Sequence, residues 1–410
     1  MPDVSFSSLL IVCVVAVVAP ALPAAIRWLR VPSVVLELML GIALGPAGIG
    51  WVHVDMPLQV LSLVGLAFLL FIAGLEIELQ SLRGRPTRIA LAGYGVTLVI
   101  GLIAGVVLHQ AGWVNKPLLL AVALSATSLG LVIPVLKDAG ELSTPMGELI
   151  VASSTVADFG AILLLSLLFS QSSGGTASRI FAIGAFAAVI AVVIVSLSRA
   201  GRSMRFNVLF DKLQHGSSEI RVRLAVLLLI GFVALASRIG LESILGAFIA
   251  GAVLNVVDRD AMAHPDFRAK LAAIGYGFVI PIFFVTSGAR LDLRALFHQP
   301  SALARVPLFL IALVAARGLP ALMYRGQLES RRVAVAALLQ ATSLPFLVTA
   351  AEIGQLIGAL SPVNAIALVS AGLVSTIAFP AAAITMLRRQ SPARTPTTMA
   401  HLVDPITTEA

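Results

Sequence analysis

The stretch ATSLG at residues 126–130 decides the fold, because its first four residues return in the stretch ATSLP at residues 341–345. Each copy lies near the middle of a long apolar segment, the first at about 117–136 and the second at about 332–353. Threonine and serine hydroxyls can pair backbone groups that leave a helical ladder. The recurrence therefore predicts two membrane helices that are interrupted at matched depth.

A residue that weakens a helix follows each copy. Gly130 follows the first copy, and Pro345 follows Ser343 and Leu344 at the end of the second. Glycine and proline both loosen the helical hydrogen-bond ladder, so we assign Gly130, Ser343 and Pro345 to the breaks. The alternative is that the hydroxyls are ordinary packing contacts between helices. Recurrence of one motif at one depth favours interruption.

Two further matches extend the repeat. LELMLG at 36–41 resembles LESILG at 241–246, and GLEIEL at 74–79 resembles GARLDL at 288–293. The starting residues of the three pairs are separated by 205, 214 and 215 residues. Each pair is also seven apolar segments apart, and an odd separation places the two copies in opposite directions across a membrane. The sequence therefore predicts an inverted-topology repeat, which is typical of secondary transporters.

Composition indicates a membrane protein throughout. Of the 410 residues, 59% are hydrophobic and 12% are charged, whereas soluble domains carry about 25% charged residues. A membrane helix needs about 20 mostly apolar residues. Thirteen such segments span about 4–26, 33–51, 58–79, 89–109, 117–136, 147–170, 178–198, 220–237, 240–257, 271–289, 303–323, 332–353 and 363–387. We predict an all-α polytopic membrane protein with about 13 transmembrane helices.

The basic residues are distributed unevenly between the loops. With the N-terminus outside, 21 of the 28 Lys and Arg residues fall on the inner side and 6 on the outer side, while Arg317 lies within a span. Because inner loops are enriched in Lys and Arg, we predict a protein of the cytoplasmic membrane with its N-terminus outside and C-terminus inside. The net charge of +8 is thus explained by the lipid bilayer and not by nucleic acid. The polar tail, residues 391–410, is predicted to be disordered.

Asp158 is the most informative single residue, since it lies midway through the segment at about 147–170. A carboxylate at mid-membrane depth costs several kcal/mol unless it is paired or hydrated, so it marks a functional site. Ser154 lies one helical turn earlier on the same face. We predict a site for a cation or a proton at Asp158 and Ser154, with Thr127 and Ser128 of the first break as further oxygen ligands.

Arg317 offers a second interpretation of Asp158, namely a structural salt bridge. It lies deep in the segment at about 303–323. A guanidinium group keeps its proton at physiological pH, so Arg317 is a poor proton carrier. We expect it to compensate charge, either that of Asp158 or that of the carbonyl ends of the broken helices.

Several other chemistries lack their signatures. The sequence has no Walker A motif for ATP, six scattered histidines and a single cysteine, Cys13, so neither a cofactor nor a metal site is expected. No segment is left for a soluble catalytic domain, and we predict a transporter and not an enzyme.

With these features in hand, the chain resembles the cation:proton antiporter-2 family within the sodium/hydrogen exchanger superfamily. The similarity covers residues 10–388. It is carried by LELMLGIALGPAGIG (36–50), GLAFLLFIAGLEIEL (65–79), ATSLGLVIPVLKDAGELST (126–144), the Asp158 segment, LGAFIAGAVLN (245–255) and PIFFVTSGARLDL (281–293).

The resemblance implies an organisation for the transmembrane domain, residues 1–390. A mobile core would comprise about 89–170 and 303–387, and a scaffold that forms a homodimer would comprise about 4–79 and 220–289. A linker helix would lie at about 178–198. The two interrupted helices would cross beside the ion-binding aspartate.

The resemblance also implies a function, the exchange of Na⁺ or K⁺ for H⁺ by competition at Asp158. The chain departs from the family pattern at Ala157, where relatives carry Asp, Asn or Gln, and electrogenic relatives often have Lys in place of Arg317. Since Asp158 alone is left to change charge, we predict electroneutral exchange. Two alternatives remain open, a sodium-coupled symporter of an organic anion and a channel-like potassium efflux protein.

Overall fold

The computed structural model describes residues 6–25, 32–76, 85–169, 184, 188, 191, 192, 219–239, 241–257, 265–291 and 303–388. The named elements in these ranges are all helices. The predicted linker helix at about 178–198 lies almost wholly outside the described residues, and the predicted tail at 391–410 lies outside them entirely.

The helices are long and apolar enough for a membrane. Within the described ranges, nine candidate spans reach 18 residues or more, and the bent pair Ser330–Gln340 and Pro345–Leu356 makes up to ten. Two shorter apolar helices, Ser33–Leu44 and Ser243–Val256, accompany them. Each predicted segment except the linker coincides with one helix or a run of consecutive helices. The all-α polytopic fold is thus confirmed, while the count of thirteen and the inverted repeat stay predictions.

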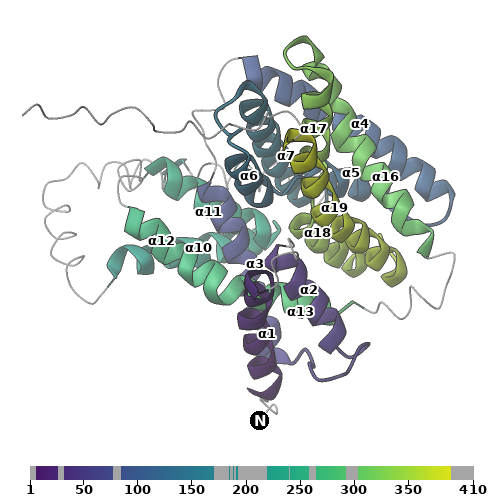
Figure 1. Ribbon diagram of the computed structural model, residues 1–410. Helices are drawn as coiled ribbons and strands as arrows, with labels where there is room; N and C mark the ends of the chain where they lie inside the picture. Colours follow the sequence, from purple (N-terminus) through teal and green to yellow (C-terminus); the bar gives the residue numbers. More distant parts are fainter. Residues whose placement is uncertain are drawn as a thin grey trace, which may run out of the picture.

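The helices form two groups that lie side by side (Figure 1). The α3 group consists of α1 (Phe6–Ala25), α2 (Ser33–Leu44), α3 (Met56–Leu75), α10 (Ile220–Arg238), α11 (Ser243–Val257), α12 (Pro265–Ile274), the π-helix η2 (Gly275–Val279) and α13 (Ile280–Ala289). The α7 group consists of α4 (Arg85–Gln110), α5 (Pro117–Ser125), α6 (Leu129–Asp138), α7 (Pro145–Phe169), α16 (Arg305–Gly318), the 3₁₀ helix η3 (Leu319–Gly326), α17 (Ser330–Gln340), α18 (Pro345–Leu356) and α19 (Pro362–Arg388).

Backbone-to-backbone packing holds the α3 group together. A Cβ atom added at Gly41 would clash with the Val285 carbonyl, where α2 meets α13, and one at Gly74 would clash with the Phe248 carbonyl, where α3 meets α11. Small residues let membrane helices approach this closely. The glycines of the LELMLG and GLEIEL stretches are therefore explained by helix packing.

The α7 group contains the two predicted breaks. Helix α5 ends at Ser125 and α6 begins at Leu129, while α17 ends at Gln340 and α18 begins at Pro345 after a bend of 43°. The breaks touch, because the Ser128 amide donates to the Thr342 carbonyl at 2.9 Å. Pairing of backbone groups between the two interruptions is what allows non-helical chain inside a membrane.

Each residue assigned to a break has a definite place. Ser343 lies in the second interruption, and Pro345 is the first residue of α18, where its missing N–H costs nothing. Gly130 lies outside the first interruption, since it is the second residue of α6 and is helical. The non-helical backbone belongs to Ala126, Thr127 and Ser128.

Candidate ion-binding site

Asp158 lies beside the first break. The Thr127 amide donates to Asp158 Oδ1 at 2.9 Å. Helix α6 starts at Leu129, so its N-terminal end faces the negative charge, which stabilises an anion. Asp158 remains partly exposed. The carboxylate is thus held in place without being closed off.

Arg317 is fully buried and makes contact with the breaks. Its Nε donates to Thr127 Oγ1 at 2.9 Å and to the Gln340 carbonyl at 3.3 Å, and Nη2 also donates to Thr127 Oγ1. Within the described residues, Arg317 forms no ion pair with Asp158 inside 4.0 Å. The guanidinium lies at the negative end of α17, and Thr127 links it to the carboxylate. Of the two expected roles, the geometry favours neutralisation of a broken helix end.

The three predicted hydroxyl ligands differ in what they already bind. Thr127 Oγ1 donates to the Gln340 carbonyl at 2.9 Å in addition to accepting from Arg317, and Ser128 Oγ accepts from the Leu344 amide at 3.1 Å. Both hydroxyls therefore hold the breaks together. Ser154 Oγ is buried and has no hydrogen-bond partner in the described part of the chain. It is the hydroxyl left free to face an ion.

The structure adds polar residues that the sequence interpretation did not include. Tyr94 of α4 pairs its hydroxyl with Ser125 Oγ at 3.2 Å at the end of α5. Gln340 donates through Nε2 to Tyr324 Oη at 2.6 Å, and Tyr324 Oη also pairs with Ser153 Oγ at 2.6 Å. Gln340 could have been found, because it is a polar residue inside an apolar segment and directly precedes the second ATSL copy.

The two ends of the site differ in accessibility. On α6, Gly130 and Pro134 are exposed, and a Cβ atom at Gly130 would meet nothing nearer than the Tyr276 hydroxyl of η2, 3.9 Å away. Helix α18 is instead buried from Phe346 through Gly354, apart from the partly exposed Glu352. We call the more exposed α6 end the open end of the site, and the more buried α18 end the closed end.

A polar contact joins the two helix groups at the closed end. Glu352 of α18 accepts a hydrogen bond from Ser287 of α13 at 2.9 Å. The same carboxylate lies 3.7 Å from Arg290, at the end of α13. A second polar contact also joins the groups, since the Glu242 amide before α11 donates to Ser166 of α7 at 3.3 Å. These contacts fasten the α7 group to the α3 group.

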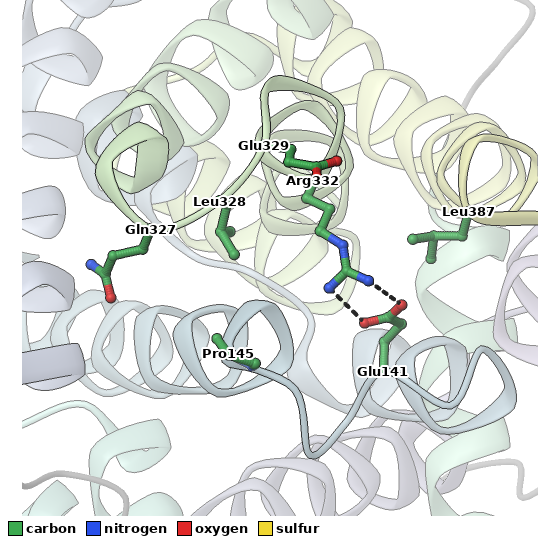
Figure 2. A pocket seen from close by; sticks show the side chains of 7 residues that line it. All are labelled: Glu141, Pro145, Gln327, Leu328, Glu329, Arg332 and Leu387. Carbon is green, nitrogen blue, oxygen red and sulfur yellow. Dashed lines mark hydrogen bonds and ion pairs between the residues drawn. The ribbon is translucent and has the colours of Figure 1, made fainter. Parts of the chain in front are cut away.

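A separate cavity of about 630 Å³ lies at the surface of the α7 group (Figure 2). Its lining includes the ion pair between Arg332 and Glu141, 3.2 Å apart, together with Pro145 and Leu387. None of the predicted site residues lines it. This cavity is therefore distinct from the candidate ion site.

Fold and site together define a class: a polytopic membrane transport protein in which two broken helices meet beside a carboxylate. The chain belongs to the sodium/hydrogen exchanger family, whose transmembrane region matches residues 13–388. Membership confirms the resemblance noted in the sequence, and with it the prediction of a transporter and not an enzyme.

Relatives with curated names support the same family. The chain is 29% identical to the "Putative Na(+)/H(+) antiporter YjbQ" of Bacillus subtilis over 93% of its own length, but spans only 63% of that protein. It is 30% identical to the "Na(+)/H(+) antiporter" of Enterococcus hirae, with 67% of this chain and 70% of that one aligned. Among solved structures, the sodium proton antiporter MjNhaP1 of Methanocaldococcus jannaschii matches with a TM-score of 0.62 at 18% identity, covering 93% of this chain and 98% of that one. That last likeness supports the fold.

Proposed function

We propose that the protein exchanges a monovalent cation, Na⁺ or K⁺, for H⁺, with Asp158 as the group that binds either one. The observation that carries this proposal is a partly exposed carboxylate at the crossing of two broken helices, one turn from the unpartnered Ser154 hydroxyl. Family membership and the names of the relatives agree with it.

Competition at one carboxylate would couple the two ions. The Thr127 amide uses Oδ1 of Asp158, so further lone pairs of the carboxylate remain for a cation together with Ser154 Oγ. Oxygen ligands suit hard cations. A proton on Asp158 removes the negative charge that a cation needs, so the two ions exclude each other.

Exchange should be electroneutral, one cation for one proton. Ala157 cannot ionise, and the Arg317 guanidinium, hydrogen-bonded to Thr127 and Gln340, stays protonated at physiological pH. Asp158 is then the group at the crossing that changes charge. It moves neutral with a proton and, with its monovalent cation, also neutral.

Movement of the α7 group against the α3 group would carry Asp158 between the two sides. With the N-terminus outside, the open α6 end faces the cytoplasm and the closed α18 end faces outward. A state that is open to the outside at the α18 end requires release of the contacts of Glu352 with Ser287 and Arg290. We further propose that the α3 group forms a homodimer, as the resemblance implies, which chemical cross-linking in native membranes would test.

Reconstitution into liposomes tests the proposal. Na⁺, K⁺ or Li⁺ added in turn to acid-loaded vesicles should dissipate the pH gradient, and a potassium/valinomycin potential should neither drive nor slow Na⁺/H⁺ exchange. Cation-driven uptake of an organic anion without pH change would instead identify a symporter. Single-channel currents without proton counterflow would identify a channel. Potential-driven proton movement that requires Na⁺ would refute one-to-one exchange.

A further inference from the structure

A closed ring of polar contacts begins and ends on α7. It runs from Ser153 through Tyr324, Gln340 and Thr127 to Asp158, five residues beyond its start. Its links are 2.6, 2.6, 2.9 and 2.9 Å. Ser154, the free hydroxyl, lies on α7 between the two ends of the ring.

Burial makes each link of the ring important. Ser153, Tyr324, Gln340 and Thr127 are exposed by only 6, 2, 1 and 3%. A buried polar group that loses its partner cannot turn to water, and the whole network weakens. Removal of one polar group from the ring should therefore weaken the hydrogen bonds of the other members.

Tyr324 occupies the place in the ring where a hydroxyl bridges α17 and α7. The Gln340 amide nitrogen only donates, so Tyr324 Oη accepts from α17 and can direct its own proton to Ser153 Oγ on α7. The backbone carbonyl of Gln340 meanwhile accepts hydrogen bonds from Thr127 Oγ1 and Arg317 Nε. Through Tyr324, the end of α17 is fastened to the helix that carries Asp158.

We propose that Tyr324 is a positioning residue for the cation site, which orients the Asp158 carboxylate toward Ser154 Oγ through Gln340 and Thr127. This inference rests on the proposed cation/proton exchange. Tyr324 touches neither ion. It acts by holding the end of α17 against α7, so that the Gln340 carbonyl keeps Thr127 in place and the Thr127 amide keeps the Asp158 carboxylate in place.

The test is the apparent KM for Na⁺ in reconstituted vesicles. Tyr324→Phe removes one hydroxyl and keeps the aromatic side chain. It should raise KM about tenfold, the effect of one lost hydrogen bond. The maximal rate should stay within about twofold, since Asp158 and the moving helices are intact. Ser153→Ala should do the same, and Ser153→Thr, which keeps a hydroxyl, should restore most of the affinity.

The double variant Tyr324→Phe with Ser153→Ala distinguishes a ring from two separate contacts. Because both changes open the same ring, the double variant should resemble the single ones. Ser237→Ala, which removes an exposed hydroxyl on α10, is the control and should leave KM unchanged.

An unchanged KM in Tyr324→Phe, a fall in maximal rate alone, or a double variant near a hundredfold would overturn the positioning role. If Tyr324→Phe does not fold, Ser153→Ala decides by the same KM criterion. Failure of the wild-type protein to exchange cations for protons would instead overturn the proposed function, and the two failures are thus distinguishable.

Discussion

The two helix breaks carry the same ATSL residues, yet they face different groups. At the first break, the Thr127 amide donates to the Asp158 carboxylate of α7 at 2.9 Å. At the second, the Ser343 amide donates to the Ser375 hydroxyl of α19 at 3.2 Å. Ser375 comes 217 residues after Asp158, the same interval that separates the first residues of α7 and α19, Pro145 and Pro362.

The ATSL motif therefore accounts for the interruption of each helix. The residue that faces the interruption, Asp158 or Ser375, decides whether a charge is present there. The single proton of Ser375 Oγ faces the Gly372 and Ser343 carbonyls, at 2.7 and 3.2 Å, so a neutral hydroxyl satisfies the second break. An aspartate in that place would add a second buried charge at a high energetic cost. With one carboxylate and one hydroxyl, the two breaks offer a single place at which we propose that an ion binds.

The largest expected effect comes from removal of the carboxylate. Asp158→Asn keeps the shape of the side chain and can still accept from the Thr127 amide, but it can neither carry a proton nor a full negative charge. We expect exchange to fall at least a hundredfold while the purified protein stays monodisperse on gel filtration. Normal exchange by the folded variant would remove Asp158 from the site.

The next effect separates the two unpartnered serines. Ser154 Oγ and Ser343 Oγ are both buried without a hydrogen-bond partner among the described residues, but Ser154 lies one turn from the carboxylate on α7. Ser154→Ala should raise the apparent KM for Na⁺ about tenfold, the loss of a hydrogen-bond-sized ligand interaction, with little change in maximal rate.

Ser343→Ala is the matched control and should leave the apparent KM for Na⁺ within about twofold. Equal effects of the two substitutions in the same vesicle assay would return both serines to helix packing.

A smaller effect concerns the closed end of the site. Glu352→Gln keeps an oxygen for Ser287 and loses the ion pair with Arg290, which is partly exposed and worth about 0–1 kcal/mol. The population of the state that is open toward α6, relative to the state that is open toward α18, should then fall by up to about fivefold. In a Cys13→Ala background, the labelling rate of Gly130→Cys by a water-soluble thiol reagent from the α6 side should fall accordingly.

Gly130→Cys with Glu352 intact provides the reference rate, and Glu352→Asp, which keeps the charge, should label at nearly that rate. Faster labelling in Glu352→Gln would contradict a role of Glu352 in closing the α18 end.

The smallest effect on transport is expected at the second break itself. Ser375→Ala leaves the Ser343 amide without its partner, which should cost about 1–3 kcal/mol of stability and lower the thermal unfolding temperature by a few degrees. Exchange at a permissive temperature should stay within about twofold, because no charge is involved. A loss of exchange comparable with Asp158→Asn would mean that the two breaks are functionally equivalent.

By themselves, hydropathy, a repeated motif and one mid-membrane carboxylate determine much of this protein. The spans follow from local apolar runs, because a lipid surface tolerates few charges. The breaks at residues 126–128 and 341–344 follow from the recurrence of ATSL at one depth. The choice of Asp158 as the candidate site residue follows from its position, since no other acidic residue lies so near the centre of a predicted segment.

Only the tertiary structure decided which polar groups meet. Arg317 binds Thr127 and the Gln340 carbonyl, which are 190 and 23 residues away in sequence, and not Asp158 directly. It also decided that the Thr127 and Ser128 hydroxyls join the breaks, while Ser154 Oγ has no hydrogen-bond partner among the described residues. Hydropathy depends on neighbours along the chain, whereas a hydrogen bond needs a partner within about 3 Å. In a bundle of crossing helices, that partner comes from another part of the sequence.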